Sequence, residues 1–281
     1  MKLPINPRIY ERVERLEIPF NRYGLDEFGV SKEHLAQFYS MLIWAYENYF
    51  TMRSFGIENV PKRGRVMLVG NHSGGVALDA AIVIGSMLMD MEPPRLAQAM
   101  ADKFMNTLPF VSGWSARLGH FTGLPEHATR LLEVDRMLMV FPEGHLGTAK
   151  LYKERNSLVK FGSGFMRLAL ETNTPIVPFA FVGGGDAIPT IHNSAFLGKL
   201  MGAPYIPFTP YIFPIPRPVN CEIYYGEPMV FEGDGNEEDS VVRHRVSLVK
   251  EQIRQLLDFG VERRKVGNLE VPNTLPKVEI T

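Results

Sequence analysis

The chain has 281 residues and carries 30 Lys and Arg against 31 Asp and Glu, so its formal charge is −1. This balance excludes a nucleic-acid binder held by bulk positive charge. A content of 45% hydrophobic and 22% charged residues also excludes an acidic disordered chain. The single cysteine, Cys221, permits no internal disulfide and no thiol-based metal site, which predicts an intracellular protein.

Residues 1–54 predict an N-terminal helical extension without a targeting signal. Residues 1–20 carry repeated charges and lack the continuous apolar core of a secretory signal. Residues 31–53 predict a helix, because Ser31 is a suitable N-cap and apolar residues recur at helical spacing. The apolar face of this helix is wide and rich in aromatic residues, which suits either core packing or a lipid interface.

Residues 55–260 predict an α/β domain with a mostly parallel central sheet flanked by helices. Short apolar runs alternate with segments of helical periodicity, which is the pattern of a parallel sheet. The predicted strands are 66–69, 96–100, 137–141, 176–182 and 221–225. The predicted helices are 78–89, 125–133, 164–172 and 237–259, with Gly260 as a C-terminal stop. Residues 261–281 are predicted to form a C-terminal tail, whose final dozen residues look extended and loosely held.

Two apolar stretches are candidates for membrane contact, but neither predicts a transmembrane span. Residues 35–46 are free of charge but too short to cross a bilayer. Residues 200–216 contain five prolines, which no regular helix tolerates. The wider stretch 195–220 carries Lys199 and Arg217 and no acidic residue. Its apolar side chains suit either a loop packed on the core or a lipid-facing lip.

His72 is the histidine whose surroundings point to chemistry. It follows a predicted strand, lies in a loop with Gly74 and Gly75, and precedes Asp79 at the start of a predicted helix. The glycines permit a sharp turn, so the imidazole and the carboxylate can meet. A catalytic imidazole needs such a carboxylate to fix its tautomer and stabilise its charged form. Ser73 is equally suited to an ordinary turn, so a purely structural loop remains the alternative interpretation.

A second candidate is the turn FPEG at residues 141–144, directly after an apolar strand. Pro142 ends the strand, Gly144 permits a tight turn, and Glu143 is presented at the strand end. An exposed glutamate in a turn would have the same pattern. The block therefore indicates chemistry only in combination with others.

In their order along the chain, these blocks resemble the glycerolipid and lysophospholipid acyltransferase superfamily. The blocks that carry the resemblance are GNHSGG at 70–75 with the following Asp79, VFPEG at 140–144 and PIVPFAFVG at 175–183. Further blocks are similar to the family at 117–121 with Gly123, at 161–165 and at 225–228. The resemblance covers residues 55–260.

The chain also departs from the family pattern. Six residues separate His72 from Asp79, whereas the commonest family block has four, and the wider spacing resembles the branch of monoacylglycerol and diacylglycerol acyltransferases. After FPEG the family continues Thr-Arg-Ser, but this chain has His145, Leu146 and Gly147, and its second block lacks the usual arginine. Those cations are associated with an acceptor phosphate, so their absence favours a neutral hydroxyl lipid. The basic residues that stand further on as substitutes are Lys150, Lys153, Arg155 and Lys160.

The resemblance implies acyl transfer from a thioester, acyl-CoA or acyl carrier protein, to a hydroxyl of a glycerolipid or related lipid. His72 would be the general base, Asp79 would orient it, and backbone N–H groups near Gly74 and Gly75 would bind the oxyanion. The residues expected to bind substrate are Ser73, Gly74, Gly75, Phe141, Pro142, Glu143, Gly144, His145 and Pro178. No metal or redox cofactor is required. The expected location is cytoplasmic, at the inner face of a membrane.

Three other classes of protein stay open. A serine hydrolase or lipase-like esterase would use Ser73 or Ser163, although neither lies in a Gly-x-Ser-x-Gly elbow. A non-catalytic lipid carrier would keep an apolar groove and would not need His72 and Asp79 together. The glycines at 183–185 follow a strand as in nucleotide-binding proteins, but no GxGxxG pattern or Walker lysine accompanies them.

Overall fold

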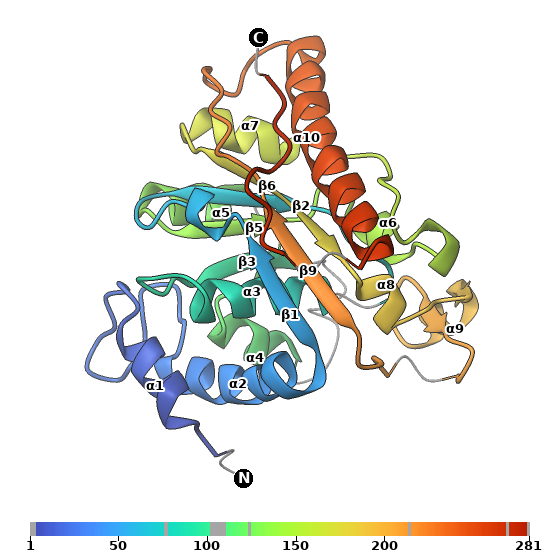
Figure 1. Ribbon diagram of the computed structural model, residues 1–281. Helices are drawn as coiled ribbons and strands as arrows, with labels where there is room; N and C mark the ends of the chain where they lie inside the picture. The colour runs from blue at the N-terminus through green and yellow to red at the C-terminus, as the bar shows by residue number, and fades with distance from the viewer. Residues whose placement is uncertain are drawn as a thin grey trace.

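A mixed β-sheet with helices on both faces forms the body of the protein (Figure 1). The computed structural model describes residues 4–75, 78–101, 111–122, 125–212, 215–267 and 270–279. Within these residues the main sheet has seven strands in the order β1-β9-β6-β2-β5-β3-β4. Their bounds are β1 Thr51–Phe55, β2 Val66–Gly70, β3 Ala97–Ala101, β4 Phe121–Thr122, β5 Met137–Val140, β6 Ile176–Val182 and β9 Asn220–Tyr225.

The strands from β6 to β4 pair in parallel, and β9 is antiparallel to β6. β1 pairs in parallel with β9 at the edge of the sheet. All residues of the central strands β2 and β6 are buried, as expected for a parallel sheet covered on both faces. The prediction of an α/β fold with a mostly parallel sheet is confirmed.

The helices divide between the two faces of the sheet (Figure 1). Leu68 of β2 belongs to one apolar cluster with residues of α1, α2 and α3, whereas Met67 and Val69 belong to a second cluster with residues of α5, α7 and α10. This division follows from the alternation of side chains along a strand. The helices are α1 Pro7–Glu14, α2 Lys32–Trp44, α3 Leu78–Met89, α4 Val111–Arg117, α5 Pro125–Glu133, α6 His145–Thr148, α7 Gly164–Glu171, α8 Gly184–Ala187, α9 Ala195–Leu200 and α10 Asp239–Lys265.

The shorter elements connect these helices and strands. A small antiparallel sheet consists of β7 (His192–Ser194) and β8 (Ile206–Phe208), on either side of α9. Single turns of other helix types are η1 Ala45–Tyr49, η2 Ile57–Asn59 and η4 Tyr152–Glu154. No helix among the described residues is both long and apolar enough to cross a bilayer.

The helix predicted over 31–53 starts correctly but ends early. The Ser31 hydroxyl accepts a hydrogen bond from the N–H of His34, as predicted for an N-cap. α2 ends at Trp44, a π-turn follows over 45–49, and residues 51–55 pair with β9 as the edge strand β1. Tertiary pairing therefore overrides the helical spacing of the last apolar residues. α1 and α2 share the apolar cluster of α3 and the sheet.

The predicted stop of the last helix at Gly260 is wrong, because α10 continues to Lys265. Gly260 is buried in the helix, and a Cβ at this position would lie 2.4 Å from the ring of Tyr224 in β9. That ring stacks on Phe55 and its hydroxyl donates to Glu222, so it cannot readily move aside. The glycine therefore permits close packing of the helix on the sheet and does not end the helix.

Residues 270–279 are extended as predicted but are not loosely held, and residues 261–265 of the predicted tail belong to α10. The side-chain amide of Gln252 in α10 donates to the carbonyl of Pro276 at 2.7 Å. Its oxygen accepts from the N–H of Val278 at 2.6 Å, and Leu275 packs on the cluster that contains Phe55. The side chain of the buried Gln252 thus holds the backbone of this segment through two hydrogen bonds.

Candidate active site

His72 and Asp79 meet at the carboxyl end of the central strand β2. β2 ends at Gly70, and Asp79 lies in the first turn of α3. The imidazole Nδ1 lies 3.1 Å from Oδ1 and 3.2 Å from Oδ2 of Asp79. Only 9% of the His72 side chain and 1% of the Asp79 side chain are exposed, so this pair interacts largely out of water. The predicted proximity of the two residues is present in the structure.

The Asp79 carboxylate is held by more than the imidazole. The N–H groups of Ser73 and Ala80 each donate to it at 2.8 Å, and the Ser73 hydroxyl donates to Oδ2 at 3.2 Å. Burial alone would raise the pKa of Asp79, but the charge and hydrogen bond of His72 together with these N–H groups lower it. Asp79 is therefore ionised at neutral pH and can stabilise an imidazolium.

Phe141 fixes the plane of the His72 ring. The two rings are stacked with centroids 4.0 Å apart and an interplanar angle of 10°. Since Asp79 accepts at Nδ1, we assign the Nδ1–H tautomer, which leaves Nε2 as the nitrogen able to accept a proton. Phe141, expected to bind substrate, thus contacts the predicted base directly.

Glu143 points inward and does not lie exposed in its turn. Its Oε2 accepts from the backbone N–H of His72 at 2.9 Å and from the ammonium of Lys150 at 2.7 Å. Its Oε1 accepts from the N–H of Val159 at 2.8 Å. Glu143 therefore supports the loop that presents His72, a role that its position in a turn did not reveal.

Lys150 does not lie where the sequence predicts it. It was a candidate for binding an acceptor phosphate, but only 1% of its side chain is exposed. Its ammonium donates to the carbonyl of His72 at 2.7 Å as well as to Glu143. Burial lowers the pKa of Lys150 and outweighs the opposing effect of the Glu143 carboxylate. The lysine therefore supports the loop that presents His72.

Gly147 explains how the Lys150 segment approaches so closely. A Cβ at this position would lie 2.7 Å from the Cβ of Glu143 and 2.9 Å from the Cβ of His72. Gly147 lies in the short helix α6, and its lack of a side chain lets this helix approach Glu143 and His72. A small residue followed three positions later by a lysine is the signal that sequence reasoning missed.

The loop glycines adopt the conformations that glycine favours. Gly74, Gly75 and Gly144 have φ of +92°, +76° and +53°, a region costly for other residues. No other described residue accepts a hydrogen bond from the N–H of Gly74 or Gly75. Two backbone donors thus remain beside His72. The residues Val76 and Ala77, which complete the spacing to Asp79, lie outside the described residues.

The other predicted substrate residues occupy different surroundings. His145 and Leu146 are exposed at the start of α6. The carbonyl of Pro142 accepts from the N–H of Gly162 at 2.9 Å. Pro178 is buried in β6, with its ring beside Gly226 on the α10 side of the sheet. The structure thus places Pro178 on the opposite face of the sheet from Phe179, whose ring packs against Phe141.

His120, in the block similar to the family's second motif, has a structural setting. Its Nδ1 accepts from the N–H of Ala99 in β3 at 3.2 Å. Burial lowers the pKa of His120 to about 4, so the ring is neutral at physiological pH. Gly123, which belongs to the same block, lies outside the described residues. In the part of the chain that the structure describes, no group of three His, Cys, Asp or Glu side chains could hold a metal ion.

Comparisons with known proteins indicate the family. A family model described as Acyltransferase matches residues 52–182, which include His72, Asp79, Glu143 and Lys150. An uncharacterised protein of Mycobacterium leprae is 31% identical over 249 residues, spanning 84% of this chain and 67% of that protein. One of Mycobacterium tuberculosis is 29% identical over 247 residues, spanning 84% and 69%.

Among solved structures, the 1-acyl-sn-glycerophosphate (LPA) acyltransferase PlsC from Thermotoga maritima shares the fold. The TM-score is 0.55 at 17% sequence identity, and the match covers 83% of this chain and 82% of that one.

The buried pair of Glu143 and Lys150 can be tested by stability. Lys150→Met leaves Glu143 buried and unpaired, so we expect a loss of about 3–5 kcal/mol in the free energy of unfolding, measured by urea denaturation. The exposed Lys153→Met should change it by less than about 0.5 kcal/mol. The double variant Glu143→Gln with Lys150→Met should recover part of the loss. Wild-type stability of Lys150→Met would contradict the pairing.

Proposed function

The chain belongs to the acyltransferase family, and on that premise we propose that His72 acts as general base in moving an acyl group from a thioester to a lipid hydroxyl. The match to the Acyltransferase family model confirms the family resemblance seen in the sequence, and transfer to a hydroxyl of a phospholipid or glycerol lipid is part of the proposal. The observation that carries the proposal is the buried contact of His72 with Asp79 at the carboxyl end of β2. Sites of α/β sheets lie at such strand ends.

The proposed step follows from the chemistry of the two substrates. An alcohol is a weak nucleophile until its proton is removed, and Nε2 of His72 accepts that proton as the oxygen attacks the thioester carbon. The carbonyl becomes an oxyanion, for which the N–H groups of Gly74 and Gly75 are the candidate donors. Collapse breaks the carbon–sulfur bond, and the imidazolium returns its proton to the leaving thiolate. Asp79 stabilises the imidazolium throughout.

The serine hydrolase alternative receives less support. The Ser73 hydroxyl donates to Asp79, so its bond is to the carboxylate and not to an imidazole. Ser163 is exposed just before α7. A nucleophilic serine needs a base within hydrogen-bond reach. Direct attack by the acceptor hydroxyl needs only the base that the site contains.

The lip at residues 195–220 is the proposed contact with a membrane. Its described part exposes Phe196, Leu200, Met201, Ile212 and Ile215, each with more than 60% of its surface in solvent. It is free of acidic residues, which suits a lipid surface. Phe213 and Pro214 of the lip lie outside the described residues.

The segment that directly precedes the lip is hydrogen-bonded to the chain next to the candidate active site. The carbonyl of Thr190 accepts from the N–H of Tyr152, and the Asn193 amide donates to the carbonyl of Ala149 at 2.6 Å. Ala149 directly precedes Lys150, whose ammonium bonds to the carbonyl of His72. A lipid that enters at the lip would therefore arrive next to the loop that presents His72. By contrast, α2 buries most of its apolar face and exposes chiefly Trp44 and Met41.

The acceptor proposed is a lipid with a neutral hydroxyl headgroup. A phosphomonoester needs fixed cations beside the reacting hydroxyl. His145 and Leu146 occupy the positions after FPEG, and the ammonium of Lys150 is committed to Glu143. The Thermotoga maritima relative acts on 1-acyl-sn-glycerophosphate, but at 17% identity the likeness concerns the fold alone.

The catalytic pair is tested by substitution. His72→Ala should lower kcat about 10²–10⁴-fold, and Asp79→Asn should lower it severely, because the base or its orientation is lost. The exposed His244→Ala on α10 is the control and should keep wild-type turnover. Circular dichroism checks the fold of each variant. Near-normal turnover in both dyad variants would overturn the assignment.

Membrane contact is tested by cosedimentation with vesicles of neutral and anionic phospholipid. The wild-type protein should bind both, and binding should survive moderate salt, because apolar insertion dominates. Phe196→Ser with Leu200→Ser should lower the bound fraction at least several-fold. Val271→Ser, equally exposed but in the tail, should have no effect. Full recovery of wild-type protein in the supernatant would contradict the proposal.

Acceptor choice is tested by comparing kcat/KM for monoacylglycerol with kcat/KM for lysophosphatidic acid, using one acyl donor. We expect the neutral acceptor to give the higher value, since Leu146 stands at the family's arginine position after FPEG and the ammonium of Lys150 is paired with Glu143. A strong preference for the phosphorylated acceptor would show that the proposal is wrong.

A further inference from the structure

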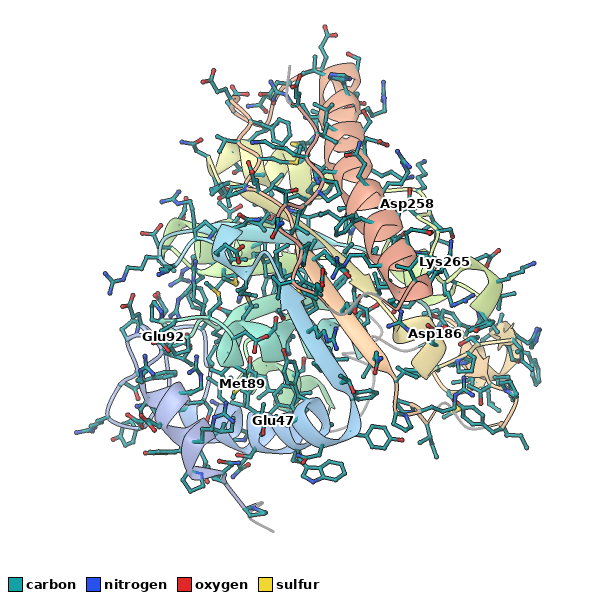
Figure 2. All side chains as sticks on the ribbon, in the orientation of Figure 1. Glu47, Met89, Glu92, Asp186, Asp258 and Lys265 are labelled. Atoms are coloured by element: carbon teal, nitrogen blue, oxygen red, sulfur yellow. The ribbon has the colours of Figure 1, made fainter. Side chains whose placement is uncertain are left out.

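Three arginines from separate parts of the chain converge on Asp186 in α8. Nε of Arg155 donates to Oδ1 at 2.9 Å, and Nη2 of Arg264 donates to Oδ2 at 3.0 Å. Nη2 of Arg217 donates to the backbone carbonyl of Asp186 at 3.1 Å. Figure 2 shows Asp186 close to the C-terminal end of α10, where Lys265 is labelled. We call Arg155, Arg217 and Arg264 the arginine cluster.

The arginine cluster carries more positive charge than its partner neutralises. Three guanidinium groups share one carboxylate, and each has five N–H donors, of which the contacts to described residues use only a few. The acidic residues Asp258 and Glu262 on α10 are paired with Arg254 and Lys265. The cluster is also accessible, because Arg217 is exposed and the other two side chains are 22–29% exposed.

The arginine cluster lies close to the loop that presents His72, because only Gly184 and Gly185 separate Arg155 from Ser73. A Cβ on Gly185 would lie 2.3 Å from the Cβ of Arg155 and 2.9 Å from the carbonyl oxygen of Ser73. A Cβ on Gly184 would lie 2.1 Å from the Ser73 hydroxyl. Only glycine therefore lets Arg155 pack this close to the residue next to His72. The same glycines are those that the sequence placed after a strand without assigning them a function.

We propose that the arginine cluster binds a phosphate of the carrier that bears the acyl thioester. This inference rests on the proposed function, since it concerns the donor of that reaction. Guanidinium groups match phosphate oxygens in geometry and charge. Coenzyme A and the phosphopantetheine arm of an acyl carrier protein both carry phosphate, whereas a neutral acceptor lipid carries none. The cluster therefore belongs to the donor side of the site.

A purely structural role predicts a different behaviour from a phosphate site. Asp186 could serve only to tie three segments together, and its loss would then affect every substrate equally. A phosphate site affects only substrates that carry phosphate. Arg217 separates the two cases best, because its exposed side chain bonds to a backbone carbonyl and not to the carboxylate.

The experiment compares initial rates with acyl-CoA, acyl carrier protein thioester and the phosphate-free acyl-N-acetylcysteamine thioester. Arg217→Gln and Arg155→Gln should raise KM for a phosphate-bearing donor about tenfold, the effect of one lost charge-assisted contact. KM for the phosphate-free donor and for the acceptor should stay unchanged. Lys265→Gln is the control. It removes one positive charge next to Arg264 at the end of α10, and it should behave as wild type because Lys265 pairs with Glu262.

Binding of coenzyme A, followed by calorimetry without turnover, separates this inference from the proposed function. Weaker binding in Arg217→Gln would support the site even in a protein that transfers no acyl group. Equal rises in KM for all three donors would show a structural role and overturn the proposal. A rise confined to the KM of lysophosphatidic acid would assign the phosphate to the acceptor and overturn it as well. The ratio of KM for acyl-CoA to KM for acyl carrier protein identifies the carrier.

Discussion

The backbone N–H and carbonyl of His72 are both hydrogen-bonded to the buried ion pair of Glu143 and Lys150, and the geometry of the site depends on these two bonds. Its N–H donates to Glu143, and its carbonyl accepts from Lys150. β2 and β5 are parallel neighbours, so their carboxyl ends bring His72 and the FPEG turn to the same place. The backbone of the loop is thereby fixed relative to the sheet independently of the contact between the His72 imidazole and Asp79. Removing either charge leaves the other buried and uncompensated, which is far more costly than losing a surface pair.

The elements predicted well are those whose signals are local. β2, β5, β6 and α3 lie within one residue of their predicted bounds, because apolar runs, glycines and prolines mark them directly. The contact of His72 with Asp79 was predictable for the same reason, since the two residues are separated by one short glycine loop. What failed depends on partners distant in the chain. Gly260 packs on Tyr224, residues 51–55 pair with β9, and Lys150 fills a site formed by two other segments. No local spacing encodes the contacts of Gly260 and of residues 51–55, and for Lys150 the local sequence offers only the small residue Gly147 three positions earlier.

The antiparallel strand β9 gathers basic residues at the edge where the site lies. Because β9 runs opposite to β6, its first residue, Asn220, lies at the carboxyl end of β6. α10 then returns along the sheet, and its last turn reaches the same edge, where Arg264 donates to the carbonyl of Asn220. A strand parallel to β6 would have carried this helix end to the opposite edge. The topology therefore delivers cations from the C-terminal region to loops encoded much earlier in the chain.

The stacking of Phe141 on His72 also constrains the kinetic order of the reaction. One face of the imidazole is covered and Nδ1 is occupied, so Nε2 is the single position at which a proton can enter or leave. Under the proposed mechanism, the acceptor oxygen and the departing sulfur must both reach that nitrogen. The two substrates must then be bound at the same time in a ternary complex. A ping-pong pattern, which requires a covalent acyl-enzyme, is incompatible with such an arrangement.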